Sequence, residues 1–230
     1  MRPERSVRPA PQHKEWSAMS DELVFYTHPM SRGRIVRWML EELGRPYRTH
    51  VLDYGATMKG PDYLAVNPMG KVPAITHGET AVTEAGAICA YLADAFPEAG
   101  LAPPLGDRRR APYFRWMFFA AGPVEGALAA HGLGVEVKPE QKRMVGWGDH
   151  ADLMTGLETA IAGRDFILGD QFSAADVYFG AHIGWGMQFG AIDRRPVFER
   201  YNERLQSRPA AIRAREIDDA LLARAQPAGG

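Results

Sequence analysis

The chain has 230 residues, 46% of them hydrophobic, which is enough apolar material for one large core or two smaller ones. Its 27 lysine and arginine residues stand against 28 acidic ones, so no overall positive field favours nucleic acid or an anionic membrane. No apolar stretch reaches the roughly 18 to 20 residues that a membrane-spanning helix needs, and the single cysteine, Cys89, excludes an internal disulfide. These properties favour a reduced, cytoplasmic protein whose partner is a small molecule.

The first residues differ in composition from the rest of the chain. They contain arginine and proline but no apolar centre, which excludes a secretory signal. We interpret residues 1–21 as a disordered leader. The internal Met19, just ahead of the first predicted strand, indicates an extended or misassigned start, and a transit peptide is the alternative that the arginines suggest.

The first half of the chain has a mixed pattern of strands and helices. A β-rich run over 23–27 predicts a strand that ends at His28 and Pro29, because proline cannot continue the pairing. Apolar residues at helical spacing from Ser31 onward predict a helix that stops at Gly44. The remaining elements predicted here are a strand over 47–52, a loop over 53–61, a short helix over 62–66, a hairpin of strands 72–76 and 81–83, and a helix over 84–95. The order β-α-β-α-β-β-α is that of a thioredoxin-like half domain.

Residues 99–107 are rich in proline and glycine and predict a linker. Beyond it the pattern is helical throughout, which predicts an all-helical second domain. Ser173 and Asp176 have the spacing of a capping box at the start of one of these helices, a feature that contributes roughly 0.5 to 2 kcal/mol. The helices predicted here cover 108–130, 140–162, 173–188, 195–207 and 209–225, with a loop over 131–139.

Two motifs carry most of the functional information. They are Asn-Pro-Met-Gly-Lys-Val-Pro at 67–73 and Thr-Glu-Ala-Gly-Ala-Ile-Cys-Ala-Tyr at 83–91. A proline at the mouth of a short strand, followed by an acidic residue that opens a helix, is suited to gripping a small peptide by its backbone. With the two-part architecture, the capping box and the closing Asn-Glu-Arg-Leu-Gln-Ser-Arg-Pro-Ala at 202–210, they resemble the cytosolic glutathione transferase family, of a bacterial type with a serine-dependent site. The resemblance covers residues 22–224.

The resemblance implies a glutathione site in the first half. Pro73 would be a cis proline that turns the backbone of Val72 outward, where it pairs with the cysteine of glutathione like a strand edge. Glu84 would take the γ-glutamyl ammonium, while the free amides of the helix start take the γ-glutamyl carboxylate. Ala85 stands where the family usually has serine, so only its backbone amide remains as a contact. Lys71 would lie beside the carboxylates of the peptide, with an ordinary solvated lysine as the alternative.

Catalysis requires the glutathione thiol, with a free pKa of about 8.5, to ionise near neutral pH. Ser31 is the first candidate for stabilising the thiolate, because its hydroxyl and the dipole of the following helix would act on the same sulfur. A helix terminus supplies at most about 2 kcal/mol, less than the roughly 2.7 kcal/mol that two pKa units require, so a hydrogen bond from Ser31 is expected to close the gap. The alternative is that Ser31 only caps its helix. Cys89 stands among small apolar residues and is predicted to be core, which argues against a thiol oxidoreductase.

The electrophile is expected over the sulfur, between the turn after the first strand and the first long helix of the second half. Part of the aromatic stripe on that helix is expected to be core instead. The apolar character of the candidates favours a hydrophobic acceptor. The wall candidates are His28, Tyr113, Trp116, Met117 and Ala120, with Tyr178 and Trp185 as further possibilities.

We therefore predict an α/β plus all-α protein with a thioredoxin-like glutathione-binding domain over 22–98, a linker over 99–107 and an acceptor-binding helical domain over 108–226. The predicted reaction is detoxifying transfer of glutathione to a small hydrophobic electrophile, with no metal and no nucleic acid or membrane partner. The resemblance also implies a twofold homodimer. The alternatives are a glutathione-dependent isomerase or dehalogenase, and a non-catalytic binding module on the same fold.

Overall fold

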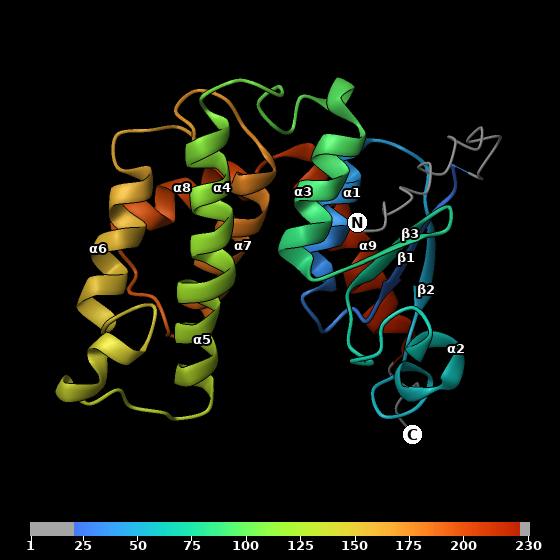
Figure 1. Cartoon of the computed structure of the whole chain (residues 1–230), viewed down its shortest axis with the longest axis horizontal. Coiled ribbons are helices and arrows are strands. Elements are labelled where there is room, and N and C mark those ends of the chain that lie inside the picture. Colours follow the sequence, from blue (N-terminus) through green and yellow to red (C-terminus); the bar gives the residue numbers. More distant parts are fainter. Residues whose placement is uncertain (1–20, 226–230) are drawn as a thin grey trace, which may run out of the picture.

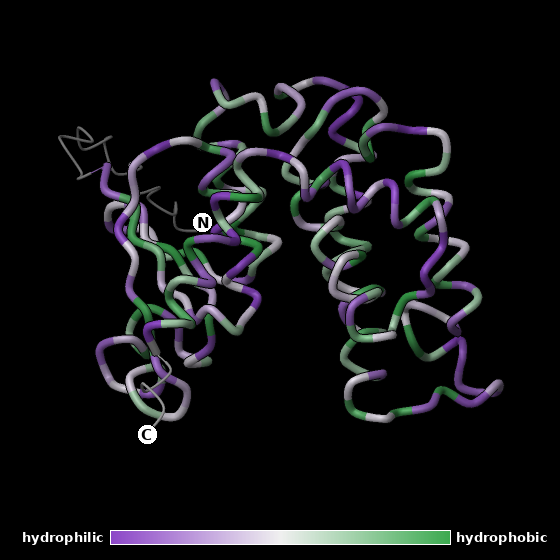
Figure 2. Tube along the Cα trace, turned by 180° about the vertical axis from the view of Figure 1, so that it is seen from behind, coloured by the Kyte–Doolittle hydropathy of each residue, from purple (hydrophilic) through white to green (hydrophobic). Residues whose placement is uncertain are grey.

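The computed structural model describes residues 21–225, which form two halves joined at one end (Figure 1). The first half contains the sheet and the second is helical. The leader predicted over 1–21 lies outside the described residues except for Asp21. In Figure 2 the hydrophobic stretches lie mainly inside each half, and the outer turns are mainly hydrophilic.

The sheet of the first half has four strands in the order β2-β1-β3-β4. β1 pairs in parallel with β2 and antiparallel with β3, and β4 pairs antiparallel with β3. Successive side chains of a strand point to opposite faces, so Phe25 joins the large core beneath the helices while Tyr26 packs at a tilt against Tyr63 on the other face. The strands are β1 (Leu23–Thr27), β2 (Arg48–Val51), β3 (Ala74–His77) and β4 (Thr80–Thr83).

Three α-helices cover this sheet, and α1 (Gly33–Leu43) is the one that the site depends on most. It ends as predicted at Gly44, whose φ of 69° suits glycine and whose N–H donates to the Leu40 carbonyl over 3.1 Å. Its first residue must also be glycine, because a Cβ on Gly33 would collide with the Thr27 hydroxyl. The other two are α2 (Pro61–Leu64) and α3 (Ala85–Ala95).

Several predicted boundaries in this half shift by one or two residues. The strand expected over 72–76 begins at Ala74, because the peptide bond between Val72 and Pro73 is cis and lies outside the ladder. The short helix expected over 62–66 occupies Pro61–Leu64 instead.

The second half is helical within the part of the chain that the structure describes, apart from one isolated bridge between Phe166 and Gly169. The long helix predicted over 108–130 is divided by a π-helical turn, because Pro123 cannot donate the regular hydrogen bond. The α-helix predicted over 140–162 is wrong in its first part: a 3₁₀ turn and a glycine at φ 69°, Gly148, precede a later start at His150. The elements are α4 (Arg110–Phe119), the π turn (Ala120–Val124), α5 (Glu125–Gly132), a 3₁₀ turn (Pro139–Met144), α6 (His150–Ile161), α7 (Ala174–Gln188), α8 (Pro196–Gln206) and α9 (Pro209–Ala225).

The predicted capping box opens the buried helix α7. The carboxylate of Asp176 accepts from the Ser173 amide over 2.9 Å and from the Tyr201 hydroxyl over 2.8 Å. The Ser173 hydroxyl also donates to this carboxylate, over 3.0 Å. Ser173 therefore supplies two of the hydrogen bonds that the buried Asp176 accepts.

The last helix, α9, returns to the first half and lies behind α1 (Figure 1). Ion pairs join the two helices in antiparallel order, which we call the α1–α9 clamp. One pair is buried: the side chains of Arg37 and Asp218 are 2% and 1% exposed and meet at 3.1 Å. The pairs are Arg34–Asp219, Arg37–Asp218 and Glu41–Arg213, together with Glu42–Arg208, in which Arg208 directly precedes α9.

Candidate functional site

A cavity of about 740 Å³ opens where the loop before β3 and the start of α3 face the start of α1 and the helix α5. We call it the sheet-edge cavity. It brings together five of the six residues expected to bind glutathione, Ser31, Lys71, Val72, Pro73 and Glu84. Its other lining residues are Met30, Arg32, Tyr54, Gly55, Met58, Lys59, Asn67, Met69, Gly70, Glu125 and Ala129.

The backbone of Val72 forms one wall of this cavity. The cis bond to Pro73 agrees with the expected geometry, and Val72 lies outside the strand ladder. The preceding Lys71 carbonyl is fixed from behind, since it accepts from the Tyr63 hydroxyl over 2.6 Å and from Asn67 Nδ2 over 2.8 Å. Asn67 is 4% exposed and forms a turn, in which its Oδ1 accepts from the Met69 amide over 3.1 Å. The wall therefore offers backbone polar groups on a rigid support.

Glu84 stands directly before α3 in a strained conformation. It combines φ 67° with ψ 120°, the only positive φ of a residue other than glycine in the described part of the chain. Such backbones cost about 1 to 3 kcal/mol and gather at ligand-binding sites. The first hydrogen bond of the helix runs from Ile88 N–H to Glu84, so the amides between them have no partner within the helix. Ala85 is buried and does not line the cavity. The Glu84 carboxylate and the free amides at the start of α3 therefore lie at the same edge of the cavity.

Two exposed lysines line the cavity. Lys71 is exposed, and Lys59 donates to the Met69 carbonyl over 2.9 Å. Together with Glu84 they give the cavity groups that complement a ligand with two carboxylates and one ammonium.

Ser31 lies where the sheet-edge cavity meets a second one. Its hydroxyl donates to the His28 carbonyl over 2.6 Å and accepts from the Gly33 amide over 2.9 Å, which is the capping role named above as the alternative. The next amide, that of Arg32, has no hydrogen-bond acceptor among residues 21–225. This corner therefore offers a free backbone donor beside a hydroxyl.

A charged network from the helical half reaches the same corner. Glu125 forms an ion pair with Arg32 and accepts from His182 Nε2 over 2.8 Å. His182 is 1% exposed, and its Nδ1 faces the Tyr178 carbonyl over 2.7 Å. Both ring nitrogens of His182 therefore face oxygen atoms, which fixes the orientation of the ring.

The electrostatics of Glu125 reflect this position. Burial raises its pKa, but the hydrogen bonds from His182 and Arg32 outweigh that effect and bring the pKa down to about 2. The sequence reasoning missed Glu125. The signal was available in Pro123, because a proline inside a long helix favours a π turn, and π turns are frequent at functional sites.

The second cavity, of about 840 Å³, lies on the other side of Ser31 and is bounded by α5, α7 and α9. We call it the helix-side cavity. Met30, Ser31 and Arg32 line both cavities. Its further lining residues are Pro29, Arg34, Leu128, His131, Gly132, Trp185, Gly186, Gln188, Phe189, Ala191, Asp219 and Leu222.

The expected acceptor wall needs correction. The four α4-side candidates belong to the hydrophobic core, with side chains 0% to 4% exposed, and line neither cavity: Tyr113, Trp116, Met117 and Ala120. His28 also lies outside both cavities, because its ring packs on Tyr54 at 4.4 Å between centroids. Of the further possibilities, Trp185 lines the helix-side cavity whereas Tyr178 is buried. The stripe on α4 faces α7 rather than the cavity.

Cys89 is core, as predicted. It is fully buried, and burial raises the pKa of its thiol far above the ordinary value. Among the described residues no His, Cys, Asp and Glu side chains are grouped to hold a metal ion, and no helix is long and apolar enough to cross a membrane.

Comparisons with known proteins agree with this geometry. Residues 30–95 match the family described as glutathione S-transferase, N-terminal domain. The chain is 30% identical over 163 residues to a glutathione S-transferase of Xanthomonas campestris pv. campestris, covering 68% of this chain and 76% of that protein. It is 26% identical over 207 residues to the disulfide-bond oxidoreductase YfcG of Escherichia coli K12, covering 82% and 92%. A glutathione transferase homologue from Sulfitobacter, solved with bound glutathione, superposes with a TM-score of 0.68 at 27% identity, covering 86% of this chain and 98% of that one. The chain belongs to the glutathione S-transferase family.

Proposed function

We propose that the protein binds glutathione in the sheet-edge cavity and transfers its thiolate to a hydrophobic electrophile in the helix-side cavity. The observation that carries this proposal is the corner of Met30, Ser31 and Arg32, which lines both cavities. A sulfur placed there reaches a ligand on either side.

Glutathione fits the sheet-edge cavity group by group. The backbone of Val72 pairs with the cysteine residue of the peptide, as an added strand would. Glu84 takes the γ-glutamyl ammonium, and the amides at the start of α3 take the neighbouring carboxylate. Lys71 and Lys59 serve the remaining carboxylate. Ala85 contributes through its backbone alone.

The thiolate is stabilised at the start of α1. The free Arg32 amide donates to the sulfur, and the Ser31 hydroxyl does so once it turns away from the His28 carbonyl, to which it donates over 2.6 Å. The Arg32 guanidinium lines the same corner and places a positive charge beside the sulfur. The protein supplies proximity and an ionised nucleophile.

The electrophile occupies the helix-side cavity. Apolar side chains from three helices and from the loop after α7 face this space: Leu128, Trp185, Phe189 and Leu222. They support a hydrophobic acceptor of modest size. The addition joins the sulfur to an electrophilic carbon, and the proton released on ionisation passes to solvent.

Glutathione-dependent disulfide exchange is a second candidate function, favoured by the likeness to the disulfide-bond oxidoreductase. Because Cys89 is fully buried, a second glutathione would have to supply the exchanging sulfur. Turnover of a mixed disulfide by wild type and by Cys89→Ser at equal rates supports this candidate. Conjugation of an aryl halide without disulfide turnover supports the transferase.

Calorimetric titration with glutathione, followed by an ultraviolet scan for bound thiolate, tests the main proposal. We expect binding, and a thiol pKa lowered below its free value of about 8.5. In Ser31→Ala the pKa of the bound thiol should rise by about one unit, and Ser31→Thr, which keeps the hydroxyl, is the matched control. An unchanged pKa in Ser31→Ala contradicts the role of this residue and leaves the Arg32 amide as the donor. No binding by wild type favours the non-catalytic module.

The twofold dimer, the cytoplasmic location and a role in detoxification stay predictions. Sedimentation equilibrium measures the first of them directly.

A further inference from the structure

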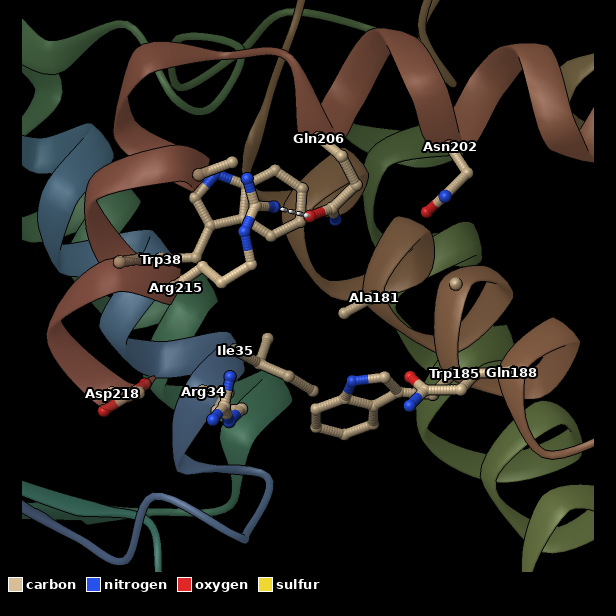
Figure 3. A pocket seen from close by; sticks show the side chains of 13 residues that line it. Arg34, Ile35, Trp38, Ala181, Trp185, Gln188, Asn202, Gln206, Arg215 and Asp218 are labelled. Atoms are coloured by element: carbon tan, nitrogen blue, oxygen red, sulfur yellow. Dashed lines mark hydrogen bonds between the residues drawn. The ribbon is translucent and has the colours of Figure 1, made fainter. Parts of the chain in front are cut away.

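A third space, which we call the inner pocket, lies where α1, α7, α8 and α9 meet (Figure 3). Its volume is about 270 Å³, enough for a single ring with a substituent. It lies outside the sheet-edge cavity and shares no residue with it. The glutathione site and the corner at Ser31 leave this space unused.

The inner pocket adjoins the helix-side cavity. Arg34, Trp185 and Gln188 line both spaces. Figure 3 shows the indole of Trp185 pointing from α7 toward Ile35 of α1, at the side of the pocket where Arg34 lies. Trp185 is half-buried and lies at the boundary, because it lines both spaces. A ligand that begins at the sulfur corner can therefore extend past Trp185.

The lining of the inner pocket favours an aromatic ring. Trp38 and Trp185 contribute two indoles, and Ile35 and three alanines contribute an aliphatic surface between them. Aromatic rings bury large areas and prefer offset or edge contacts with other rings. The alanines are Ala181, Ala211 and Ala214.

The lining also contains polar atoms that lack a partner. Asn202 Oδ1 and Asp218 Oδ2 are buried and accept no hydrogen bond from any residue that the structure describes. Asp218 is 1% exposed, and burial raises the pKa of its carboxyl even beside Arg37. An unpartnered buried acceptor is costly, and a ligand hydroxyl would satisfy it.

Two of the three charged residues that line the pocket belong to ion pairs. Arg34 pairs with Asp219 over 2.7 Å and Asp218 with Arg37 over 3.1 Å. Arg215 donates to the Gln206 side chain over 3.2 Å at the exposed rim, a contact drawn in Figure 3. A neutral ligand suits this environment better than an ion.

We propose that the inner pocket is a second chamber of the acceptor site, and that it receives a neutral phenolic ring of an extended, two-ring electrophile. This inference rests on the proposed function and adds the substrate class. The reactive carbon stays at the sulfur corner, the first ring lies in the helix-side cavity, and the phenolic ring passes Trp185. Its hydroxyl donates to Asn202 Oδ1.

Three enones with the same reactive group test the proposal. Benzylideneacetone has one ring, chalcone replaces its acyl methyl by a phenyl ring, and 4′-hydroxychalcone adds a hydroxyl to that ring. In each, sulfur bonds to the β-carbon, the C=C electrons move toward the carbonyl, and the enolate takes a proton from solvent. We expect kcat/KM to rise by at least about tenfold from the one-ring to the two-ring enone, and further with the hydroxyl.

Asn202 is half-buried and, of the three spaces, lines only the inner pocket. Two substitutions at this position distinguish the effect of the pocket's size from the effect of the hydrogen bond to the ligand. Asn202→Phe should fill the chamber and reduce kcat/KM for 4′-hydroxychalcone to that of benzylideneacetone. Asn202→Leu should remove only the preference for the hydroxylated enone over chalcone. If Asn202→Phe does not fold, Ala181→Leu fills the same space from α7.

Equal kcat/KM for the three enones in wild type overturns the proposal, as does an unchanged two-ring preference in the variant that fills the chamber. If no enone turns over, calorimetry with 4′-hydroxychalcone decides: binding that Asn202→Phe abolishes supports the chamber, and its absence overturns it. Titration with glutathione in the same preparation reports separately on the proposed function, so failure of one is distinguished from failure of the other.

Discussion

The two walls of the site contact a ligand with different parts of the chain. The sheet-side wall is made by Val72, Pro73 and the start of α3, and the helix-side wall is made by α5, α7 and α9. On the first wall the groups that face the cavity are mainly backbone, fixed by a cis bond and a strained Glu84. On the second they are side chains from helices far apart in sequence. A backbone wall suits one constant peptide, whereas a side-chain wall can change with each substitution.

The helix-side wall keeps its position only if α9 stays packed against α1. The buried ion pair of Arg37 and Asp218 holds these two helices together. We expect Asp218→Ala to reduce the free energy of unfolding by about 3 to 5 kcal/mol, because it leaves Arg37 buried without a counter-charge. The neighbouring Asp219→Ala, which breaks the more exposed pair with Arg34, should cost less than about 1 kcal/mol. Urea denaturation of both variants measures the difference. Equal costs would mean that burial is not what distinguishes the two pairs.

Glu125 joins the two walls, so its removal should loosen one from the other. Since its folded pKa of about 2 lies below the usual 4.5, its contribution is complete above about pH 5 and fades as the pH falls toward 2. We expect Glu125→Gln to lower the free energy of unfolding at pH 7 by about 3 kcal/mol and by much less near pH 2.5.

Urea denaturation of wild type and Glu125→Gln at both pH values tests this, and Glu136→Gln, an exposed glutamate in the loop after α5, is the matched control. A deficit that is the same at both pH values would show that the carboxylate charge plays no part.

A substitution in the sheet-side wall should change the affinity for glutathione rather than the free energy of unfolding. We expect Glu84→Ala to weaken glutathione binding by about tenfold, equivalent to about 1.4 kcal/mol, through loss of the contact with the ammonium. Affinity for the hydrophobic electrophile should not change. Calorimetry measures the effect, with Glu79→Ala in the β3–β4 turn as a charge-matched control. Full affinity in Glu84→Ala would remove this residue from the site.

A substitution in the helix-side wall should change the KM for the electrophile but not the affinity for glutathione, and its effect should be smaller. Phe189, 70% exposed, covers part of its cavity, so Phe189→Ala should raise KM for a hydrophobic electrophile by about threefold and leave glutathione affinity unchanged. Phe118, 71% exposed on α4 and outside both cavities, provides the control. If the two substitutions act alike, the assignment of this wall is wrong.

The contrast between the walls also explains what could be predicted from the sequence. Val72, Pro73 and Glu84 belong to two short motifs whose local geometry brings them together, so residue type and spacing were sufficient. The face that α4 turns inward depends on its packing against α7, and a stripe of aromatic residues looks the same whether it lines a cavity or fills a core.

Pairing across the two halves was beyond local patterns as well. Glu125 reaches Arg32 only after the helical half has docked, and it reaches His182 only after α5 and α7 have packed together. The charges on α1 and α9 are complementary in antiparallel order, but the sequence does not state which helices will be neighbours.

The α1–α9 clamp has a consequence for how the chain can come apart. The connection between the halves, with Pro103, Pro104 and Gly106, is the natural place for a protease to cut, and Leu105 beside them is 87% exposed. A cut there would leave α9 on the fragment that carries α4 to α8, yet still packed against α1 and holding Arg37 through Asp218. The two pieces would therefore remain associated, and a nicked molecule should elute from a sizing column as an intact one while running as two bands under denaturing conditions.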